Sequence, residues 1–189
     1  MEFIKNVDIN KLSLIKKTID LNMKISLESL KRPYGLCVGR SIKKGFLADD
    51  ISNYATALTA AGSDARMAGS NLPVMSNSGS GNQGISTTIP VVAYAEGFDL
   101  DKDELIRAVT LSNLVTIYIK LSLGSLSALC GASISATGAC CGIIYLMGAG
   151  ESKIKLSIQN IMGNITGMIC DGAKAGCALK VATSTNAAI

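Results

Sequence analysis

The chain of 189 residues contains no histidine and no tryptophan. The absence of histidine excludes a Ser-His-Asp triad, a histidine-ligated zinc site and acid–base catalysis by imidazole. Any chemistry must therefore rest on thiols, carboxylates, amines, amides and hydroxyls. Aromatic residues make up only 4% of the chain, so the core must be built from aliphatic and small side chains.

Charged residues are also scarce, at 17% of the chain against 48% for apolar residues. A chain this apolar is not disordered, and its length predicts a single domain over residues 1–189 with a sizeable core. We expect part of its apolar area to be covered by another domain or subunit. The net charge of +4 forms no basic stripe with interleaved aromatic residues, so the sequence does not indicate nucleic-acid binding.

The first residues, Met1 to Asn6, lack the basic-then-apolar order of a secretory leader. We therefore expect a cytoplasmic protein whose six cysteines stay reduced. Two of them, Cys140 and Cys141, are adjacent and cannot easily bridge to each other. This pair is interpreted as a detail of core packing.

The hydrophobic pattern of the first third predicts helices. An amphipathic helix is expected over residues 8–30, ended by the turn residues 31–35. Asp49 or Asp50 can cap a second, alanine-rich helix that runs to about residue 61, followed by a loop over residues 62–66. The apolar positions at helical spacing in the first helix are Leu12, Ile15, Ile19, Met23 and Leu27.

The later part of the chain continues the helical pattern. Asp101 begins a helix that runs to about Leu121, with acids in the first turn and Lys120 near the end, as the helix dipole prefers. The pattern of residues 153–168 predicts one more helix. There is no convincing run of alternating strand residues, no internal repeat and no linker. The predicted fold class is therefore all-α, with a central buried helical region and cysteine-bearing loops.

Residues 121–150 contain no charged side chain, which is long enough to cross a bilayer. The segment has no aromatic belt and no basic flank, so a buried central helix is favoured over a membrane span. Gly124, Gly131 and Gly138 recur every seven residues and would leave a bare strip against which a helix or a cofactor could pack. The polar residues that argue against a span are Ser122, Ser125, Ser127, Ser133, Ser135 and Thr137.

The loop from Pro73 to Gly84 is the first feature that suggests chemistry. Gly79 to Gly84 has the spacing of a dinucleotide fingerprint, but that motif needs a preceding strand and an uninterrupted helix, and Pro90 interrupts the segment after it. The glycines, hydroxyls and amides suit a cradle for an anion such as a carboxylate, with Arg66 as a charged partner. A flexible loop that binds nothing is the alternative.

Cys130, Cys170 and Cys177 are the second such feature. The segment from Met168 to Cys177 places glycines, a cation and an anion between two thiols. Thiolates are preferred ligands of soft metals and iron–sulfur clusters, and a glycine-rich loop lets the backbone wrap such a centre closely. The spacing matches neither a zinc finger nor the compact ferredoxin run, and buried structural thiols remain the alternative.

Several segments, in the same order, resemble the L-serine dehydratase alpha-chain family, and within it most closely the L-cysteine desulfidase-like proteins. They are residues 63–67, 73–85, 126–131 and 170–181, and the resemblance runs over nearly the whole chain. It implies an all-helical catalytic domain that uses no pyridoxal phosphate and binds an oxygen-sensitive [4Fe-4S] cluster. By motif, the resemblance assigns the three cluster ligands to Cys130, Cys170 and Cys177.

The resemblance also implies a reaction on a small β-substituted amino acid. With three thiolate ligands, one iron keeps an open position and acts as a Lewis acid on the leaving group. Loss of hydrogen sulfide from L-cysteine, or of water from L-serine, gives aminoacrylate, which hydrolyses to pyruvate and ammonia. No residue stands out as the base. The expected substrate-binding residues are Arg66, Ser78, Gly79, Ser80, Gly81, Asn82, Gln83 and Lys174.

Members of this family are considerably longer, and this chain resembles their C-terminal part. We therefore expect a homo-oligomer, or association with a missing N-terminal half or subunit. The alternative function is a non-catalytic helical binding or assembly domain, or an inactive fragment, whose cysteines are buried and structural.

Overall fold

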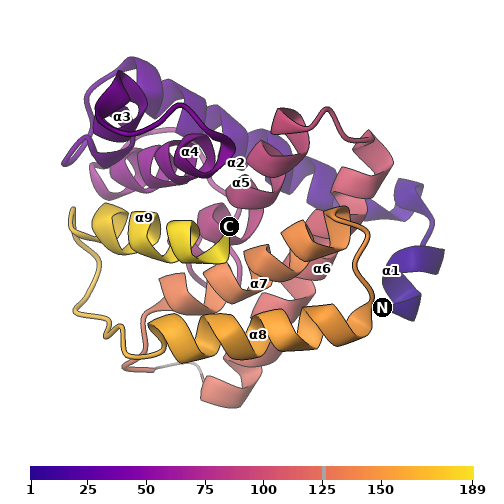
Figure 1. The fold of residues 1–189 in the computed structure, drawn as a ribbon. Helices are drawn as coiled ribbons and strands as arrows, with labels where there is room; N and C mark the ends of the chain where they lie inside the picture. The colour runs from indigo at the N-terminus through magenta and orange to yellow at the C-terminus, as the bar shows by residue number, and fades with distance from the viewer. Residues whose placement is uncertain (125–126) are drawn as a thin grey trace.

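The computed structural model describes residues 1–124 and 127–189, with all their side chains except that of Phe46. Ser125 and Leu126, which belong to the uncharged stretch and to one family-like segment, lie outside the described residues. Within these ranges the chain is helical and has no strand, which confirms the all-α prediction (Figure 1). The main helices are α1 (Glu2–Asn6), α2 (Ser13–Lys31), α3 (Val38–Ser41), α4 (Ile51–Met67), α5 (Gly81–Gly97), α6 (Lys102–Leu123), α7 (Gly131–Leu146), α8 (Glu151–Ile165) and α9 (Cys177–Ala188). Short helical turns, η1 (Ile9–Leu12) and η2 (Ile42–Phe46), precede α2 and follow α3.

Aspartate caps fix the starts of the long helices. Asp50 accepts a hydrogen bond from the Asn53 N–H at 2.8 Å, and Asp101 accepts from the Glu104 N–H at 3.1 Å. Such caps satisfy N–H groups that have no partner within the helix. The predicted helices after Asp50 and Asp101 are therefore confirmed at their first residues.

Two predicted interruptions are wrong. Residues 62–66 are not a loop, because α4 continues through them to Met67. Gly62 lets α4 approach α2 closely, since an ideal Cβ there would lie 2.5 Å from Ser26 Oγ. Pro90 does not interrupt the following helix either: it is buried inside α5, where tertiary packing outweighs the lost backbone hydrogen bond.

The buried face of α2 also differs from the prediction. Leu27, one of the expected core positions, is exposed. The buried side chains of α2 are mostly small and polar. Small side chains allow close packing against α4, and the side-chain amide of Asn22 binds the Met75 carbonyl in a neighbouring loop. These buried residues are Thr18, Asn22, Ile25, Ser26 and Ser29.

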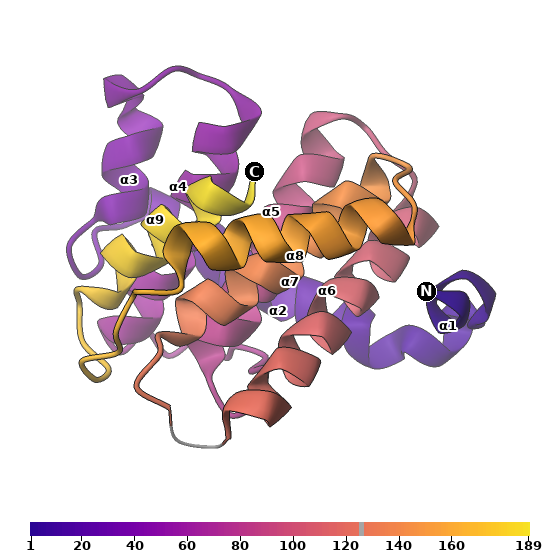
Figure 2. The same cartoon turned by 60° about the horizontal axis from the view of Figure 1, so that its bottom comes forward.

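Helix α7 occupies the centre of the molecule, in contact with α5, α6, α8 and α9 (Figures 1 and 2). Its residues 132–143 are buried without a break, as expected for a central buried helix. The bare strip is formed by Gly138 and Gly142, against α6: an ideal Cβ at Gly138 would lie 2.1 Å from Thr116 Oγ1. Gly124 is not part of it, because this residue ends α6 with a positive φ.

The uncharged residues 121–150 do not form one helix. They are divided between the end of α6, a connection and α7, whose 16 residues are fewer than the roughly 20 needed to span a bilayer. By length and composition alone, α6 is the one described helix that could cross a membrane, and 39% of its most apolar window is buried inside the protein.

Candidate functional site

A tight turn connects the extended segment after α4 to the start of α5. Asn77 and Ser80 exchange backbone hydrogen bonds at 3.1 and 3.0 Å. The two residues between them have positive φ, 48° at Ser78 and 83° at Gly79. A two-residue turn of type I′ requires positive φ at both of these positions. The turn therefore holds Gly79 and Ser80 at a fixed place directly before α5.

Side chains of α2 and α6 anchor this loop. Asn22, fully buried on α2, donates to the Met75 carbonyl at 3.2 Å and accepts from the Met75 N–H at 2.9 Å. Asn77 donates to the side-chain oxygen of Asn113 on α6 at 2.9 Å. At Gly84, an ideal Cβ would lie only 1.9 Å from the Met75 carbonyl oxygen. The loop is thus ordered in advance, which reduces the entropy lost when a ligand binds.

The first turn of α5 lies beside a guanidinium group. Ser80 is the N-cap residue and accepts a hydrogen bond from the Gln83 N–H at 3.3 Å. Arg66, in the last turn of α4, lies against Gly81, where an ideal Cβ would be 2.2 Å from Arg66 Nε. A helix N-terminus and a guanidinium both favour negative charge. Together they suit a carboxylate.

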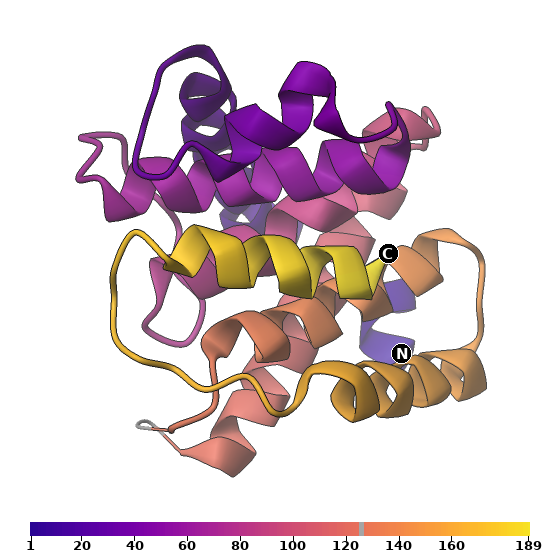
Figure 3. The same ribbon diagram turned by 60° about the vertical axis from the view of Figure 1, so that its left-hand side comes forward.

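Two chain segments bring Cys130 and Cys170 together. The Cys130 N–H donates to the Met168 carbonyl at 2.9 Å, and the Cys170 N–H donates to the Ala128 carbonyl at 2.7 Å. Cys130 immediately precedes α7, and Cys177 is the first residue of α9. Figure 3 shows the connection between α8 and α9 along the left edge of the view, passing the start of α7 before it enters α9.

The turn, Arg66 and the three thiols line one cavity of about 180 Å³. Residues expected from separate sequence motifs therefore meet at one place, with predicted cradle residues and predicted metal ligands in the same lining. The full lining is Arg66, Gly79, Ser80, Asn82, Gln83, Cys130, Gly131, Ala132, Cys170, Gly172, Ala173, Cys177 and Val181.

Three residues of the predicted substrate cradle do not line this cavity. Ser78 lines two neighbouring surface cavities instead, and its hydroxyl donates to Asn77 Oδ1 at 2.8 Å. Gly81 contributes only the bare backbone against which Arg66 lies. Lys174 forms an exposed ion pair with Asp171 outside the cavity.

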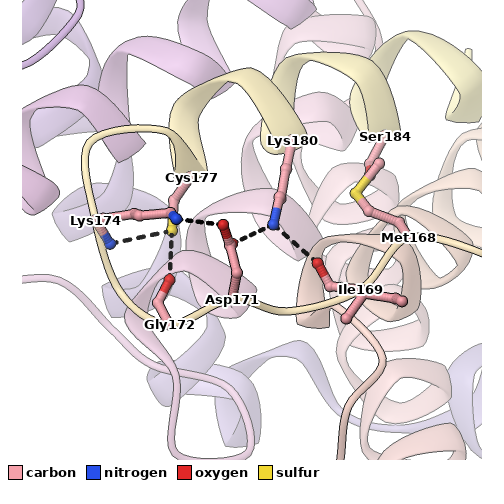
Figure 4. A network of polar contacts seen from close by, with 8 residues as sticks. All are labelled: Met168, Ile169, Asp171, Gly172, Lys174, Cys177, Lys180 and Ser184. Carbon is pink, nitrogen blue, oxygen red and sulfur yellow. Dashed lines mark hydrogen bonds and ion pairs between the residues drawn. The ribbon is translucent and has the colours of Figure 1, made fainter.

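Lys180 is a cation near the thiols that the sequence interpretation missed. It lies three residues after Cys177 on α9, donates to the Ile169 carbonyl at 2.8 Å and pairs with Asp171, which also pairs with Lys174 (Figure 4). Hydrogen bonds from Lys174 and Lys180 hold the pKa of Asp171 well below its usual range. The spacing of three from Cys177 was the available signal, since it places both residues on one helix face.

Two side-chain atoms of the cradle are buried without a hydrogen-bond partner in the part of the chain that the structure describes. They are Asn82 Oδ1 and Gln83 Nε2. An unpaired buried polar group costs about 1–3 kcal/mol. Of the residues with such atoms, Asn82 and Gln83 also line the thiol cavity, so one acceptor and one donor lie unpaired beside it.

The thiols of the cavity influence one another. Burial raises the pKa of the Cys130 thiol, the neighbouring Cys170 and Cys177 add to the rise, and Lys180 acts against it. By contrast, Cys141 lies inside α7, where burial raises its pKa to about 12. The thiols therefore divide into a group that lines the cavity and others that serve packing.

The donor set suits an iron–sulfur cluster by its chemistry. No group of three His, Cys, Asp or Glu side chains within residues 1–124 and 127–189 is arranged to hold a single metal ion. A cluster is larger than one ion, so its thiolate ligands stand further apart. Three thiols around one cavity, with no carboxylate in the described lining, fit such a group better than they fit a hard cation.

A comparison with known families decides the classification. Residues 2–189 match the family model described as serine dehydratase alpha chain. The chain belongs to the serine dehydratase alpha chain family. This confirms the resemblance that the sequence motifs indicated.

Curated relatives are identical to this chain at about half of its positions. They include proteins named UPF0597 from Oleidesulfovibrio alaskensis (50% identical, covering 100% of this chain and 45% of the relative) and Parabacteroides distasonis (46%, 100% and 45%). One from Clostridium perfringens is 51% identical, covering 99% of this chain and 45% of the relative. The chain thus spans less than half the length of these relatives and corresponds to their C-terminal part. No solved structure matches.

Proposed function

We propose that this chain is the cluster-bearing and substrate-holding portion of an iron–sulfur-dependent lyase that uses no pyridoxal phosphate. The reaction is elimination of hydrogen sulfide from L-cysteine or of water from L-serine. One observation carries the proposal: three thiols and an anion cradle with unpaired polar groups line the same cavity. We also propose that the protein works in the cytoplasm, where thiols stay reduced.

The cradle residues would bind and orient the amino acid through its α-substituents. Arg66 and the first turn of α5 suit the carboxylate, and the unpaired Gln83 Nε2 is a further donor to it. The unpaired Asn82 Oδ1 is an acceptor for the α-ammonium group. With both α-groups held at the cradle, the β-substituent would extend toward the thiol side of the cavity.

Cys130, Cys170 and Cys177 would hold the cofactor. A [4Fe-4S] cluster bound by three thiolates keeps one iron without a protein ligand and supplies a Lewis acid for the departing thiolate or hydroxyl. The α-proton and the β-substituent leave the substrate, and the resulting aminoacrylate takes up water to give pyruvate and ammonium. The three thiols would lose their protons on becoming ligands, so uptake of the cofactor becomes more favourable as pH rises.

A non-catalytic helical module with buried structural cysteines is the competing function, favoured by the burial of Cys130. Anaerobic reconstitution with iron and sulfide separates the two. We expect broad visible absorption that is lost in Cys177→Ala and kept in Cys37→Ala, because Cys37 lies beside α3 and outside the cavity. Equal spectra of the two variants, or no uptake by the reduced chain, would support the non-catalytic module.

A product assay determines the substrate. Pyruvate release from L-cysteine and from L-serine is measured on the reconstituted chain mixed with the remaining segment of the O. alaskensis relative. Pyruvate together with sulfide assigns L-cysteine, and pyruvate from L-serine alone assigns a dehydratase. A cluster-loaded mixture that releases neither product contradicts the lyase proposal.

A further inference from the structure

Large apolar side chains gather on the outer side of α6 and the N-terminal segment. Tyr118 and Leu121 are 73% and 77% exposed. Residues 114, 117, 118 and 121 have the spacing of one helix face, at the end of α6 that projects at the bottom of Figure 2. We call this the α6 surface. Its exposed residues are Phe3, Leu14, Leu114, Ile117, Tyr118 and Leu121.

The α6 surface is hollowed, and the hollow leads to the substrate cradle. A cavity of about 390 Å³ lies between the N-terminal segment, α2, the cradle loop and α6, and a second of about 530 Å³ adjoins it at Ile117. Ser78 lines both of these cavities. Gly79 lines the second one and also the thiol cavity. The outer face of the cradle turn is therefore part of the α6 surface.

Positive charge borders this apolar hollow. Lys11 lines the first cavity and Lys120 the second, and the described lining of both contains no carboxylate. Two copies of the chain that met through this surface in a symmetric dimer would bring like charges together, which is unfavourable. A partner with apolar side chains flanked by acidic ones is complementary to it.

We propose that the α6 surface docks a polypeptide that corresponds to the part of the longer relatives that this chain does not cover. That part is more than half of their length, which is enough for a second folded unit. A contiguous exposed apolar face marks a site of interaction with another polypeptide, and this face adjoins the thiol cavity at Gly79. The occupant presents an apolar ridge with acidic residues facing Lys11 and Lys120.

Docking here also completes the proposed lyase site, and this consequence rests on the proposed function. The described lining of the thiol cavity contains no carboxylate and no lysine, and the chain has no histidine. A partner seated on the α6 surface contacts the cradle turn at Gly79 and can bring the group that removes the substrate α-proton. A docked partner would thus account both for the absence of a catalytic base in the described lining and for the exposed apolar α6 surface.

The experiment measures binding between the chain and the remaining segment of the O. alaskensis relative, fused to a solubility carrier. Sedimentation velocity and fluorescence anisotropy are recorded without iron or substrate, so a failure of the lyase proposal leaves this readout unaffected. We expect a 1:1 complex whose Kd rises about tenfold or more, about 1.4 kcal/mol, in Leu121→Glu. Leu156→Glu, an exposed position on α8, should leave the Kd unchanged.

Circular dichroism verifies that each variant folds, and Tyr118→Glu is a second test if Leu121→Glu does not. Three results overturn the proposal. One is the absence of a complex at about 100 µM of each partner. The second is a complex that both α6 variants leave intact. The third is self-association of the chain that Leu121→Glu abolishes, because the occupant is then a second copy.

Discussion

Gly84 offers the sharpest test of how the cradle loop is held. It is buried in the first turn of α5, and a Cβ at this position would lie 1.9 Å from the Met75 carbonyl oxygen, whereas ordinary contact begins at 3.4 Å. Alanine would therefore have to move a backbone carbonyl by about 1.5 Å. The carbonyl and the N–H group of Met75 are both hydrogen-bonded to the Asn22 side chain, so the displacement breaks these two hydrogen bonds as well.

The expected cost of Gly84→Ala is the balance of three contributions. Overpacking costs about 1–3 kcal/mol, and each of the two hydrogen bonds to Asn22 contributes about 1 kcal/mol. Alanine gains about 1 kcal/mol over glycine in helix propensity. The net loss in unfolding free energy is therefore about 2–4 kcal/mol, which lowers the folded-to-unfolded ratio more than tenfold.

Urea unfolding followed by far-ultraviolet circular dichroism measures this loss. The matched control is Gly163→Ala on α8, where a Cβ would meet nothing within 4 Å, so the same substitution should stabilise the chain by up to about 1 kcal/mol. If Gly84→Ala is as stable as the wild type, the close packing of α5 against Met75 does not exist and the reasoning is refuted.

Three further predictions concern the core, the Cys170 loop and the cradle. Burial raises the pKa of Asp64, so the folded chain keeps the carboxyl proton to higher pH than the unfolded chain does. The unfolding free energy of the wild type minus that of Asp64→Asn should therefore fall as pH rises from about 4. If urea titrations show this difference rising with pH, the prediction is contradicted. Lys180→Met removes the hydrogen bond to the Ile169 carbonyl and should speed proteolytic cleavage within residues 169–176 several-fold. The control is Lys155→Met, which loses only an exposed ion pair on α8. Equal cleavage rates in the two variants would exclude anchoring of this loop by Lys180. Gln83→Leu removes an unpaired buried donor, so it should raise the unfolding free energy by about 1–3 kcal/mol. The same variant should weaken L-cysteine binding to the iron-loaded chain about tenfold by calorimetry, and unchanged affinity would remove Gln83 from the cradle.

Helix starts were predictable from sequence because their causes are local. An aspartate before a helical pattern supplies its own hydrogen bond to the next N–H groups, as Asp50 and Asp101 do. The family motifs likewise pointed to residues that the fold brings to one cavity. These residues come from α4, the turn before α5, the first turn of α5, the start of α7, the α8–α9 connection and the start of α9.

What sequence reasoning missed depends on tertiary contacts. Residues 62–66 have the composition of a loop, but Gly62 there allows close packing of α4 on α2. Asn22 reads as a surface residue of an amphipathic helix, yet it is buried because it binds the backbone of Met75, 53 residues away. Lys174 stands in the conspicuous loop but pairs with Asp171, whereas the charge of Lys180 on α9 acts on the Cys130 thiol.

The most direct test of the central claim is the iron content of Cys130→Ser after anaerobic reconstitution, compared with Cys140→Ser. Both cysteines are buried, but only Cys130 lines the cavity with Cys170 and Cys177. We predict about four irons per chain in the wild type and in Cys140→Ser, and a loss of most of this iron in Cys130→Ser. Equal iron in the two variants would contradict the assignment of Cys130 as a cluster ligand.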